Sequence, residues 1–495
     1  MAEPLLLALD QGTTSTRAIL FDRAGLPLAT ASRPLRQSYP ADGWVEHDAE
    51  EIFVACTAVL REAVASAGRD VADVAAIGIT NQRETVVVWD RATGRPIHPA
   101  IVWQDRRTAQ VCDRLKPAEA EVAEVTGLLI DPYFSATKIA WILDHVEGAR
   151  GRAEHGELLA GTIDAWVVWK LTGGKVHATD ATNASRTLLY DLARQAWSPR
   201  MLELFAVPAA MLPEVRDTAA DFGETLPDLL GRPVRIGAVV GDQQGALMGQ
   251  GCIGARQMKA TYGTGCFLLL HTGETRPVSR SRLLTTVAAR LGGRTTYALE
   301  GSIFVAGAAI QWMEQGLGVE GGPHAVEALA RSAREGHGVM LVPAFTGLGA
   351  PWWDADARGA LSGLTRDSGL AEIAHAVFDS SALQTRDLLE AMRADAPDAL
   401  GPGSELRIDG GMAKSAWFAQ RLADLTGQGV HRVTFQETTA LGAALFAGLQ
   451  AGVYSSIEEA AGARPQGETL TPGLDAHARE AAYARWLDAV ARVRT

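Results

Sequence analysis

The stretch LLLALDQGTTSTRAILF, residues 5–21, contains two short apolar runs around a polar centre. Residues 5–9 and 17–21 have the composition of β-strands, whereas residues 10–16 are rich in Gly, Thr and Ser. The stretch therefore predicts a β-hairpin with a polar tip. Because glycine lets the backbone approach a ligand closely and hydroxyl groups donate hydrogen bonds, such a tip can hold phosphate groups.

The same pattern, an apolar strand that runs into a glycine turn, occurs twice in the second half of the chain. Residues 259–262 lead into Gly263-Thr264-Gly265, and residues 406–408 lead into Asp409-Gly410-Gly411, a turn expected to open a helix. Repetition of this pattern predicts two α/β halves of similar design.

A third apolar strand, residues 236–240, ends at Gly241-Asp242 and leads into a segment rich in Ala, Leu and Met that reads as a helix. We place the domain boundary just after this helix begins. The expected domains are residues 1–248 and residues 249–495.

Periodicity and turn residues predict further elements. Helices are expected after Asp48, over residues 369–396 and over residues 476–493, and strands over residues 75–80 and 85–89. Residues 148–156 and 401–404 are expected to be exposed connections. The segment Asn81-Gln82-Arg83-Glu84 lies between the two strands, and polar residues at strand ends are candidates for a site.

Size and charge narrow the class of protein. A chain of 495 residues with 47% hydrophobic residues exceeds what one core usually supports, which predicts two or three globular domains. The formal net charge of -12 disfavours nucleic acid and anionic membrane surfaces as partners. No apolar stretch approaches the roughly 20 residues that span a bilayer, so membrane insertion is not expected.

The four cysteines, Cys56, Cys112, Cys252 and Cys266, form neither a CxxC pair nor a dense framework. Such a pattern is typical of buried free thiols in a reducing compartment. The N-terminal residues lack the basic region of a secretory signal. We therefore expect a cytoplasmic protein.

The motif GxxxxGK[ST] is absent, so a nucleotide would not be held by a P-loop. Each of the three glycine turns could be an ordinary turn and nothing more. Two Gly/Thr turns on similar domains could, however, clamp phosphates from opposite sides, and Gly410-Gly411 could present backbone amides to a nucleoside. Together the three turns favour a nucleotide cleft.

Several long motifs resemble the glycerol kinases of the FGGY carbohydrate kinase family, in order along nearly the whole chain. They are LDQGTTS at 9–15, ITNQRET at 79–85, DPYFS at 131–135, GDQQ at 241–244, TYGTGCF at 261–267, PAFTGLGAP at 343–351 and ETTALGAA at 437–444. Pentulose kinases of the family tend to carry a Gln-Met-His-Gly type of segment where this chain has Asn-Gln-Arg-Glu. The resemblance therefore favours the glycerol enzymes.

This resemblance implies an α/β fold of two ribonuclease-H-like domains, of the actin and hexokinase type, with the active site in the cleft between them. It also implies ATP-dependent phosphorylation of glycerol to sn-glycerol 3-phosphate, the first step of glycerol catabolism. The residues implied to bind the polyol are Arg83, Glu84, Trp103, Tyr133, Asp242, Gln243 and Phe267. Arg83 and Glu84 also admit a second interpretation, an ion pair at the surface or between the domains.

Asp242 resembles the family's catalytic base, which accepts the proton of the attacking hydroxyl group. An unperturbed Asp has a pKa of about 4 and is a weak base toward an alcohol. Because phosphoryl transfer passes through a loose transition state, its main contribution would be to align the hydroxyl. Asp242 could at the same time cap the helix that follows Gly241.

The resemblance also assigns the residues of the nucleotide and metal sites. The nucleotide-binding residues would be Thr13, Thr14, Ser15, Arg17, Thr264, Gly307, Gln311, Gly411 and Ser415. Ser415 replaces an Asn that is common in glycerol kinases, so a contact with the adenine edge would be missing. Asp10 would hold Mg²⁺ through water.

Three other functions share parts of this pattern. A kinase for another small polyol or ketose would differ only in the pocket residues. An ATP-driven switch of the actin or heat-shock-70 type would not need the polyol pocket, and a catalytically dead sensor would not need Asp10 and Asp242.

Family members form dimers or tetramers, so the resemblance implies a homodimer or a homotetramer. The stretch that corresponds to a sugar-bisphosphate loop of some members, near residues 229–235, is shorter and different here. No histidine lies between His177 and His271, where other members are phosphorylated. We therefore predict that both kinds of regulation are weak or absent.

Overall fold

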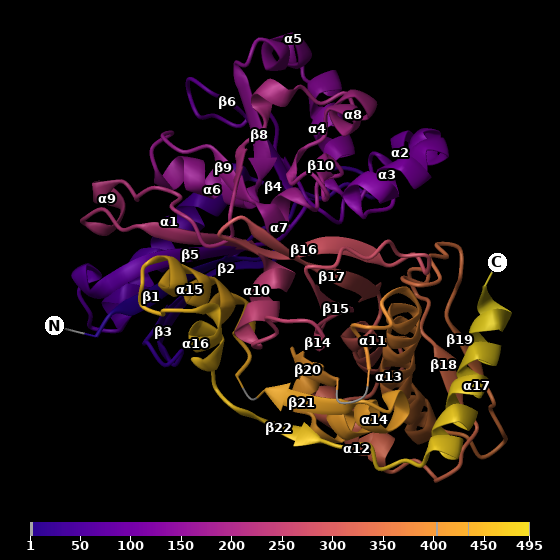
Figure 1. Ribbon diagram of the computed structural model, residues 1–495. Coiled ribbons are helices and arrows are strands. Elements are labelled where there is room, and N and C mark those ends of the chain that lie inside the picture. Colours follow the sequence, from indigo (N-terminus) through magenta and orange to yellow (C-terminus); the bar gives the residue numbers. More distant parts are fainter. Residues whose placement is uncertain (1–2, 402–403, 434, 495) are drawn as a thin grey trace.

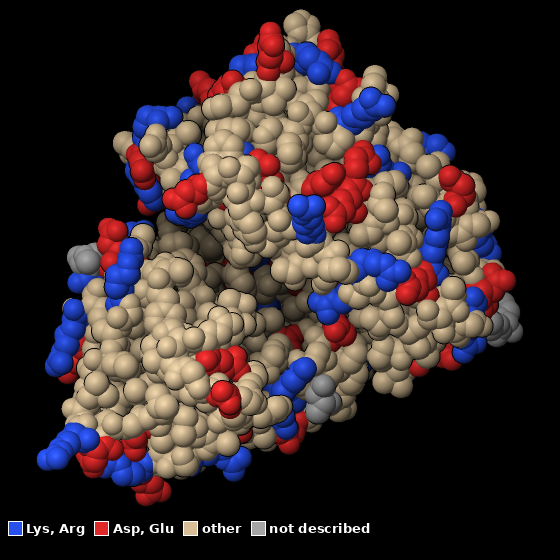
Figure 2. All heavy atoms as spheres, turned by 180° about the vertical axis from the view of Figure 1, so that it is seen from behind, with Lys and Arg blue, Asp and Glu red and all other residues tan. Residues whose placement is uncertain are grey.

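The structure is a computed structural model that describes residues 3–401, 404–433 and 435–494. Figure 1 shows an upper part built from the first half of the chain, a lower part built mostly from the second half, and the C-terminal helix at the outer edge of the lower part. Seen from behind, the molecule is hollowed between these two parts (Figure 2).

The first half contains a sheet in the order β13-β5-β1-β2-β3. The hairpin predicted from residues 5–21 lies at its centre, because β1 (Leu5–Gln11) pairs antiparallel with β2 (Ser15–Phe21). Strand β5 (Val74–Asn81) runs parallel to β1, and β13 (Ile236–Gly241) runs parallel to β5. Consequently β1, β5 and β13 end at the same edge of the sheet.

The second half repeats this arrangement in the sheet β16-β17-β15-β14-β20-β21-β22. Strands β14 (Gln257–Tyr262) and β15 (Cys266–Gly273) form the equivalent hairpin, and β20 (Glu405–Asp409) and β21 (Gly429–Val433) follow in parallel. Each half therefore has an antiparallel hairpin continued by parallel strands, which confirms the predicted pair of ribonuclease-H-like α/β domains.

The remaining strands complete or flank these two sheets. They are β3 (Pro27–Pro34), β4 (Glu46–His47), β6 (Val86–Asp90), β7 (Ala100–Ile101), β8 (Leu158–Thr162), β9 (Ala178–Asp180), β10 (Tyr190–Asp191), β11 (Ala196–Trp197), β12 (Glu214–Arg216), β16 (Leu284–Leu291), β17 (Arg294–Ile303), β18 (Met340–Val342), β19 (Ala360–Ser362) and β22 (Gly467–Leu470). A separate sheet, β4-β7-β6-β8, extends the first half beyond its main sheet.

Helices cover the sheets of both halves (Figure 1). They are α1 (Ala49–Ser66), α2 (Ala109–Leu115), α3 (Glu119–Thr126), α4 (Ser135–His145), α5 (Ala149–Glu154), α6 (Ile163–Leu171), α7 (Ala181–Ala184), α8 (Pro199–Leu204), α9 (Pro227–Leu230), α10 (Asp242–Gly249), α11 (Gly307–Gln315), α12 (Gly322–Arg331), α13 (Leu370–Asp395), α14 (Ala416–Thr426), α15 (Thr438–Gln450), α16 (Ile457–Gly462) and α17 (Ala476–Val493). No helix in the described ranges is long and apolar enough to cross a bilayer.

Most predicted elements are confirmed, and two expectations are wrong in detail. Helices α1, α13 and α17 agree with the predictions, and Asp48 caps α1 by accepting a hydrogen bond from the Glu50 amide at 2.8 Å. Residues 148–156, predicted to be an exposed connection, contain helix α5, because Gly148 adopts a left-handed conformation that lets the chain turn directly into a helix. The predicted loop 401–404 lies partly outside the described residues.

The second correction concerns Asp409-Gly410-Gly411, which does not open an α-helix directly. A single 3₁₀ turn, Met412–Lys414, follows, and α14 begins only after Ser415. The four cysteines are buried free thiols, as predicted.

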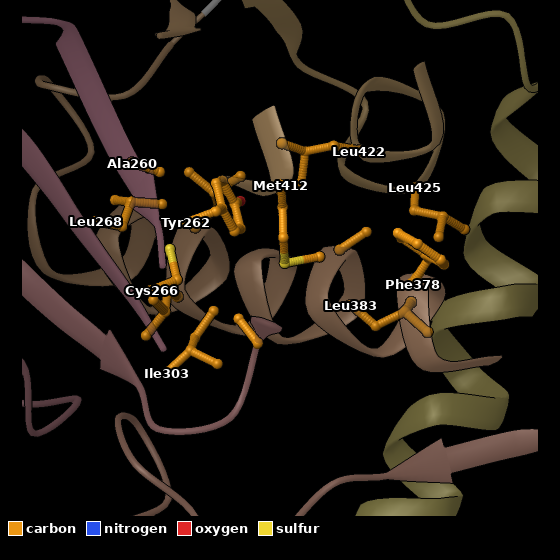
Figure 3. Packing of buried hydrophobic residues seen from close by; sticks show 14 of the residues in the cluster. Ala260, Tyr262, Cys266, Leu268, Ile303, Phe378, Leu383, Met412, Leu422 and Leu425 are labelled. Atoms are coloured by element: carbon orange, nitrogen blue, oxygen red, sulfur yellow. The ribbon is translucent and has the colours of Figure 1, made fainter. Parts of the chain in front are cut away.

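The hydrophobic core of the second half supports the two turns at Gly263 and Gly410. Tyr262, the last residue of β14, is buried among Cys266, Ile303 and Met412 (Figure 3). Its hydroxyl group forms a 2.7 Å hydrogen bond with Thr385. The turn that follows Tyr262 is therefore anchored to a rigid core.

Helix α15 comes from the second half of the chain but packs on the main sheet of the first half, beside α10 (Figure 1). The two helices approach each other closely through glycines. A Cβ atom on Gly442 would overlap the carbonyl oxygen of Gly245, and one on Gly249 would overlap that of Thr438. Because α10 begins at Asp242, the spacing of these helices fixes the position of that residue.

We predict that Gly442→Ala destabilises the protein and lowers its turnover, because the added methyl group forces α10 and α15 apart. Overpacking of this kind costs about 1–3 kcal/mol. Thermal unfolding and steady-state kinetics measure the two effects. Gly462→Ala is the matched control, since a Cβ atom there meets no neighbouring atom within 4 Å. Equal melting temperatures for the two variants would contradict the prediction.

Candidate active site

The first of the three glycine turns is the tip of the hairpin between β1 and β2. The amide of Gly12 donates to the carbonyl oxygen of Ser15 at 3.0 Å, which closes the turn. The side chain of Thr14 is exposed, and those of Thr13 and Ser15 are half-buried. The Thr13 hydroxyl also accepts a hydrogen bond from the indole of Trp103 at 2.9 Å. This last contact links the predicted phosphate and polyol residues.

The second turn, Gly263-Thr264-Gly265, rests on the start of helix α11. The amide of Gly307 donates to the Gly263 carbonyl oxygen at 3.0 Å, and that of Ala308 donates to Thr264 at 3.0 Å. A Cβ atom on Gly307 would lie 2.5 Å from the Gly263 oxygen, so only glycine allows this approach. Gln311 lies one turn further along α11 and is exposed.

The third turn follows β20 and packs against the end of β14. Gly410 has a φ of 90°, and a Cβ atom there would overlap the backbone of Tyr262. A Cβ atom on Gly411 would meet nothing within 4 Å. Ser415 caps helix α14, since its hydroxyl oxygen accepts the Phe418 amide at 3.0 Å. The open side of this turn is therefore at Gly411.

Arg83 and Glu84 belong to a buried network of charges that joins the two halves. Arg83 makes a bidentate contact with Glu300 of β17, at 2.6 and 3.1 Å. Arg186 donates to Glu84 at 2.7 Å and to Glu300 at 2.9 Å. All four side chains are at most 2% exposed. Glu84 is held with a φ of 61°, which is uncommon for a residue other than glycine.

Arg83 and Glu84 thus take part in an ion-pair network between the halves, in line with their second interpretation, and their role in binding a polyol stays a prediction. Sequence reasoning missed Arg186 and Glu300. One signal was present, because Glu300 is the single charged residue in residues 295–303, TTYALEGSI, which are otherwise uncharged. Arg186 lies two residues after the end of α7. Nothing in the sequence around it indicates a buried charge.

The two glutamates of this network have opposite pKa shifts. Burial alone would raise the pKa of Glu300, but Arg186 and Arg83 lower it to about 2. For Glu84 the effect of burial is larger than that of Arg83 and Arg186, and the pKa is raised. Glu300 is therefore the permanently charged partner that holds the two arginines.

Asp242 is the first residue of α10, at the point where β13 ends. Its carboxylate accepts the backbone amide of Gln243 at 2.7 Å and lies 3.2 Å from the Nε atom of Arg83. The N-cap position belongs to Gly241, whose amide donates to the Thr182 hydroxyl at 2.9 Å. A third of the Asp242 side chain is exposed, so it can reach a bound molecule while Arg83 fixes its orientation.

Two of the three predicted aromatic residues meet. The rings of Trp103 and Tyr133 lie edge to face with centroids 5.5 Å apart. Phe267 is half-buried on β15, and within the described part of the chain its ring makes no stacking contact with either of them. Trp103 and Tyr133 therefore form one aromatic pair in the first half, whereas Phe267 belongs to the second half.

The surroundings of Asp10 suit a cation. Burial raises the pKa of Asp10 to about 6, Arg17 at 3.5 Å opposes this rise, and the carboxylates of Glu437 and Asp242 add to it. Arg17 is itself shared with Glu437, at 2.8 Å. Among the described residues, no three acidic, histidine or cysteine side chains converge closely enough to hold a metal alone. A Mg²⁺ ion here would need phosphate oxygens and water as further ligands.

Comparison with known proteins assigns the chain to a family. The N-terminal domain pattern of the FGGY family of carbohydrate kinases matches residues 5–249, and the C-terminal domain pattern matches residues 258–451. The chain belongs to this family. Its two ribonuclease-H-like halves thus correspond to the two domains of the family.

Several proteins of known function or structure are similar over their full length. Glycerol kinase of Ectopseudomonas mendocina is 55% identical over 492 residues, 99% of each chain, and glycerol kinase 1 of Pseudomonas aeruginosa is 54% identical over the same length, with the same coverage. The crystal structure of Plasmodium falciparum glycerol kinase with ADP superposes with a TM-score of 0.94 at 31% identity, covering 99% of this chain and 98% of that one.

We predict that Glu300→Gln destabilises the protein by about 3–5 kcal/mol, because it leaves two buried arginines without a full negative charge. The pKa of Glu300 is lowered from 4.5 to about 2, so its contribution is complete above pH 4.5 and is lost as the pH falls toward 2. The loss of stability should therefore be equal at pH 5 and pH 7. Urea unfolding at both values tests this.

Glu480→Gln is the control for this variant. Glu480 contacts Arg386 at 2.7 Å but is 61% exposed, so its loss should cost less than about 1 kcal/mol. A cost for Glu300→Gln that disappears between pH 7 and pH 5 would show that Glu300 takes up its proton in that range.

We predict that Asp10→Asn raises the melting temperature of the ligand-free protein. The folded pKa of about 6 lies above the ordinary value of 3.8, so the ionised carboxylate disfavours the folded state, most strongly above pH 6. The increase should be larger at pH 7.5 than at pH 5, as measured by calorimetry. A variant that is less stable than the wild type at pH 7.5 would mean that the contact with Arg17 outweighs burial.

Proposed function

We propose that this protein transfers the γ-phosphoryl group of ATP to glycerol and releases sn-glycerol 3-phosphate. Full-length similarity to glycerol kinases of several bacteria supports the reaction. The observation that carries the proposal is the position of Asp242, an accessible carboxylate held 3.2 Å from Arg83 at the edge where the strands of the first half end. ADP release with Mg²⁺-ATP and glycerol tests it.

The polyol would bind between the charged network and the aromatic pair. Arg83 and Gln243 can donate hydrogen bonds to its hydroxyl groups, and Glu84 and Asp242 can accept them. Trp103, Tyr133 and Phe267 would cover the hydrocarbon edge. A site whose buried groups pair each hydroxyl rejects analogues that lack one of them by a large factor.

ATP would lie across the glycine turns of the two halves. Thr13, Thr14, Ser15 and Arg17 would contact phosphates from the first half, and Thr264, Gly307 and Gln311 from the second. Backbone amides at Gly411 would face the nucleoside, with Ser415 beside them. Asp10 would hold Mg²⁺ through water, and the ion would neutralise charge on the phosphates.

In the reaction, Asp242 would orient the attacking hydroxyl and take its proton. Its carboxylate is fixed by Arg83 on one side and by the Gln243 amide on the other, so little reorganisation is needed. In a loose transition state this alignment contributes more than basicity does.

Three further assignments belong to the same proposal. Residues 1–248 and 249–495 would act as the two domains. The four free thiols support a reducing, cytoplasmic location. The enzyme would assemble as a homodimer or homotetramer, and sedimentation of the purified protein tests this.

We predict that Asp242→Asn lowers kcat by a factor of about 10² to 10⁴ and leaves the Kd for ATP within about twofold of the wild-type value. An amide still accepts the hydrogen bond from Gln243 but cannot take a proton from the acceptor. Coupled ADP release and calorimetric titration measure the two quantities. Asp475→Asn, at the N-cap of α17, is the control and should retain wild-type kinetics.

The same assay with a panel of acceptors tests the substrate. Glycerol, dihydroxyacetone, erythritol, xylulose and gluconate are compared by kcat/KM. A clear preference for any acceptor other than glycerol would overturn the substrate assignment. Substantial turnover by the Asp242→Asn variant would remove Asp242 from the role of base.

A further inference from the structure

Lys259 is a charged residue in an unusual place. It lies on β14, two residues after the strand begins, and its residue exposure is 0%. Buried lysines are rare unless their charge is compensated. The described residues offer no carboxylate within ion-pair distance of its ammonium group, although Asp409 and Asp242 lie near enough to oppose the effect of burial on its pKa, which is lowered. Hydrogen bonds from neighbouring polar groups must therefore compensate part of its charge.

The ammonium group of Lys259 bonds to two side chains. It donates to the Oε1 atom of Gln243 in a short hydrogen bond, and to the hydroxyl of Thr261 at 3.1 Å. Thr261 belongs to the same strand, whereas Gln243 follows Asp242 on α10. The contact therefore joins the hairpin of the second half to the helix that carries the proposed base.

This contact determines which end of the Gln243 amide faces outward. An ammonium group has three donors and no acceptor, so only the carbonyl oxygen of the amide can face it. The Nε2 end must then point away, and no hydrogen-bond acceptor for it occurs within the described ranges. Gln243 is 9% exposed, which leaves this end available to a small molecule.

We propose that Lys259 is a positioning residue that locks the amide of Gln243 as a hydrogen-bond donor toward the acceptor substrate. This inference rests on the proposed role of Gln243 in binding the polyol. Without Lys259 the amide could rotate by 180° and offer its oxygen instead.

If the amide of Gln243 is fixed as a hydrogen-bond donor, the hydroxyl groups of the polyol are oriented as well. A hydroxyl group that accepts from Gln243 must direct its own proton to another partner, and the carboxylates of Asp242 and Glu84 are the acceptors of the site. Lys259 would thus act through Gln243 on the orientation of the hydroxyl protons. Its loss should raise the KM for glycerol and leave the KM for ATP unchanged.

A double-mutant cycle tests the inference. We expect Lys259→Met to raise the KM for glycerol about tenfold, which corresponds to about 1.4 kcal/mol. Gln243→Ala should raise it by a similar or larger factor. Because both changes would remove the same interaction, adding Lys259→Met to Gln243→Ala should change the KM for glycerol by less than about twofold.

Thr385→Val is the matched control. It removes the buried hydrogen bond to Tyr262 of the same strand, and also the one that the Thr385 hydroxyl donates to the Ser381 carbonyl oxygen within α13, without touching Gln243. It should lower the melting temperature but not raise the KM for glycerol. If the methionine variant is not recovered folded, Lys259→Gln replaces it, because an amide at this position can donate or accept and so also releases Gln243.

The outcomes separate this inference from the proposed function. An equal factor for Lys259→Met in the wild-type and Gln243→Ala backgrounds would overturn it, as would an unchanged KM for glycerol in Lys259→Met when Gln243→Ala raises it. An unchanged KM in Gln243→Ala alone would remove Gln243 from the polyol site, and the role of Lys259 with it, while glycerol phosphorylation itself would stand.

Discussion

The bidentate contact between Arg83 and Glu300 joins the two halves of the molecule at its centre. Glu300 comes from the second half, and through Arg83 and Arg186 it controls where Asp242 and Glu84 point. Removing charges from water is expensive, so each of these buried side chains depends on its ionic partners in the network. The acceptor site that we propose therefore takes residues from both halves.

The carboxylates of the site show how one functional group serves different ends. Glu300 faces two guanidinium groups and has a lowered pKa, whereas Asp10 faces one arginine and two other carboxylates and has a raised pKa. The charge of Glu300 is compensated by arginines of the protein itself. The negative charge around Asp10 is only partly compensated by Arg17, which fits the proposed place of Mg²⁺ beside the phosphates.

Short sequence patterns were enough to predict much of the fold and part of the candidate site. Apolar runs around Gly12, Gly263 and Gly410 were enough to predict the three turns, because strand and turn propensities act over a few residues. The pairing of Arg83 with Glu300 could not be predicted in the same way, since the two residues are 217 positions apart and meet only through the packing of two sheets. Helix α5 was missed because a short polar helix and a polar loop have similar compositions.

Helix α15 also bears on how the chain can be divided. It covers the sheet of the first half with a segment made near the end of synthesis, so an N-terminal fragment that stops near residue 248 would leave the apolar side of β1, β5 and β13 open to solvent. Such a fragment would expose a large apolar surface and would be prone to aggregate. A split or circularly permuted form of this enzyme would need residues 438–450 to accompany the first half, whichever point of the chain is cut.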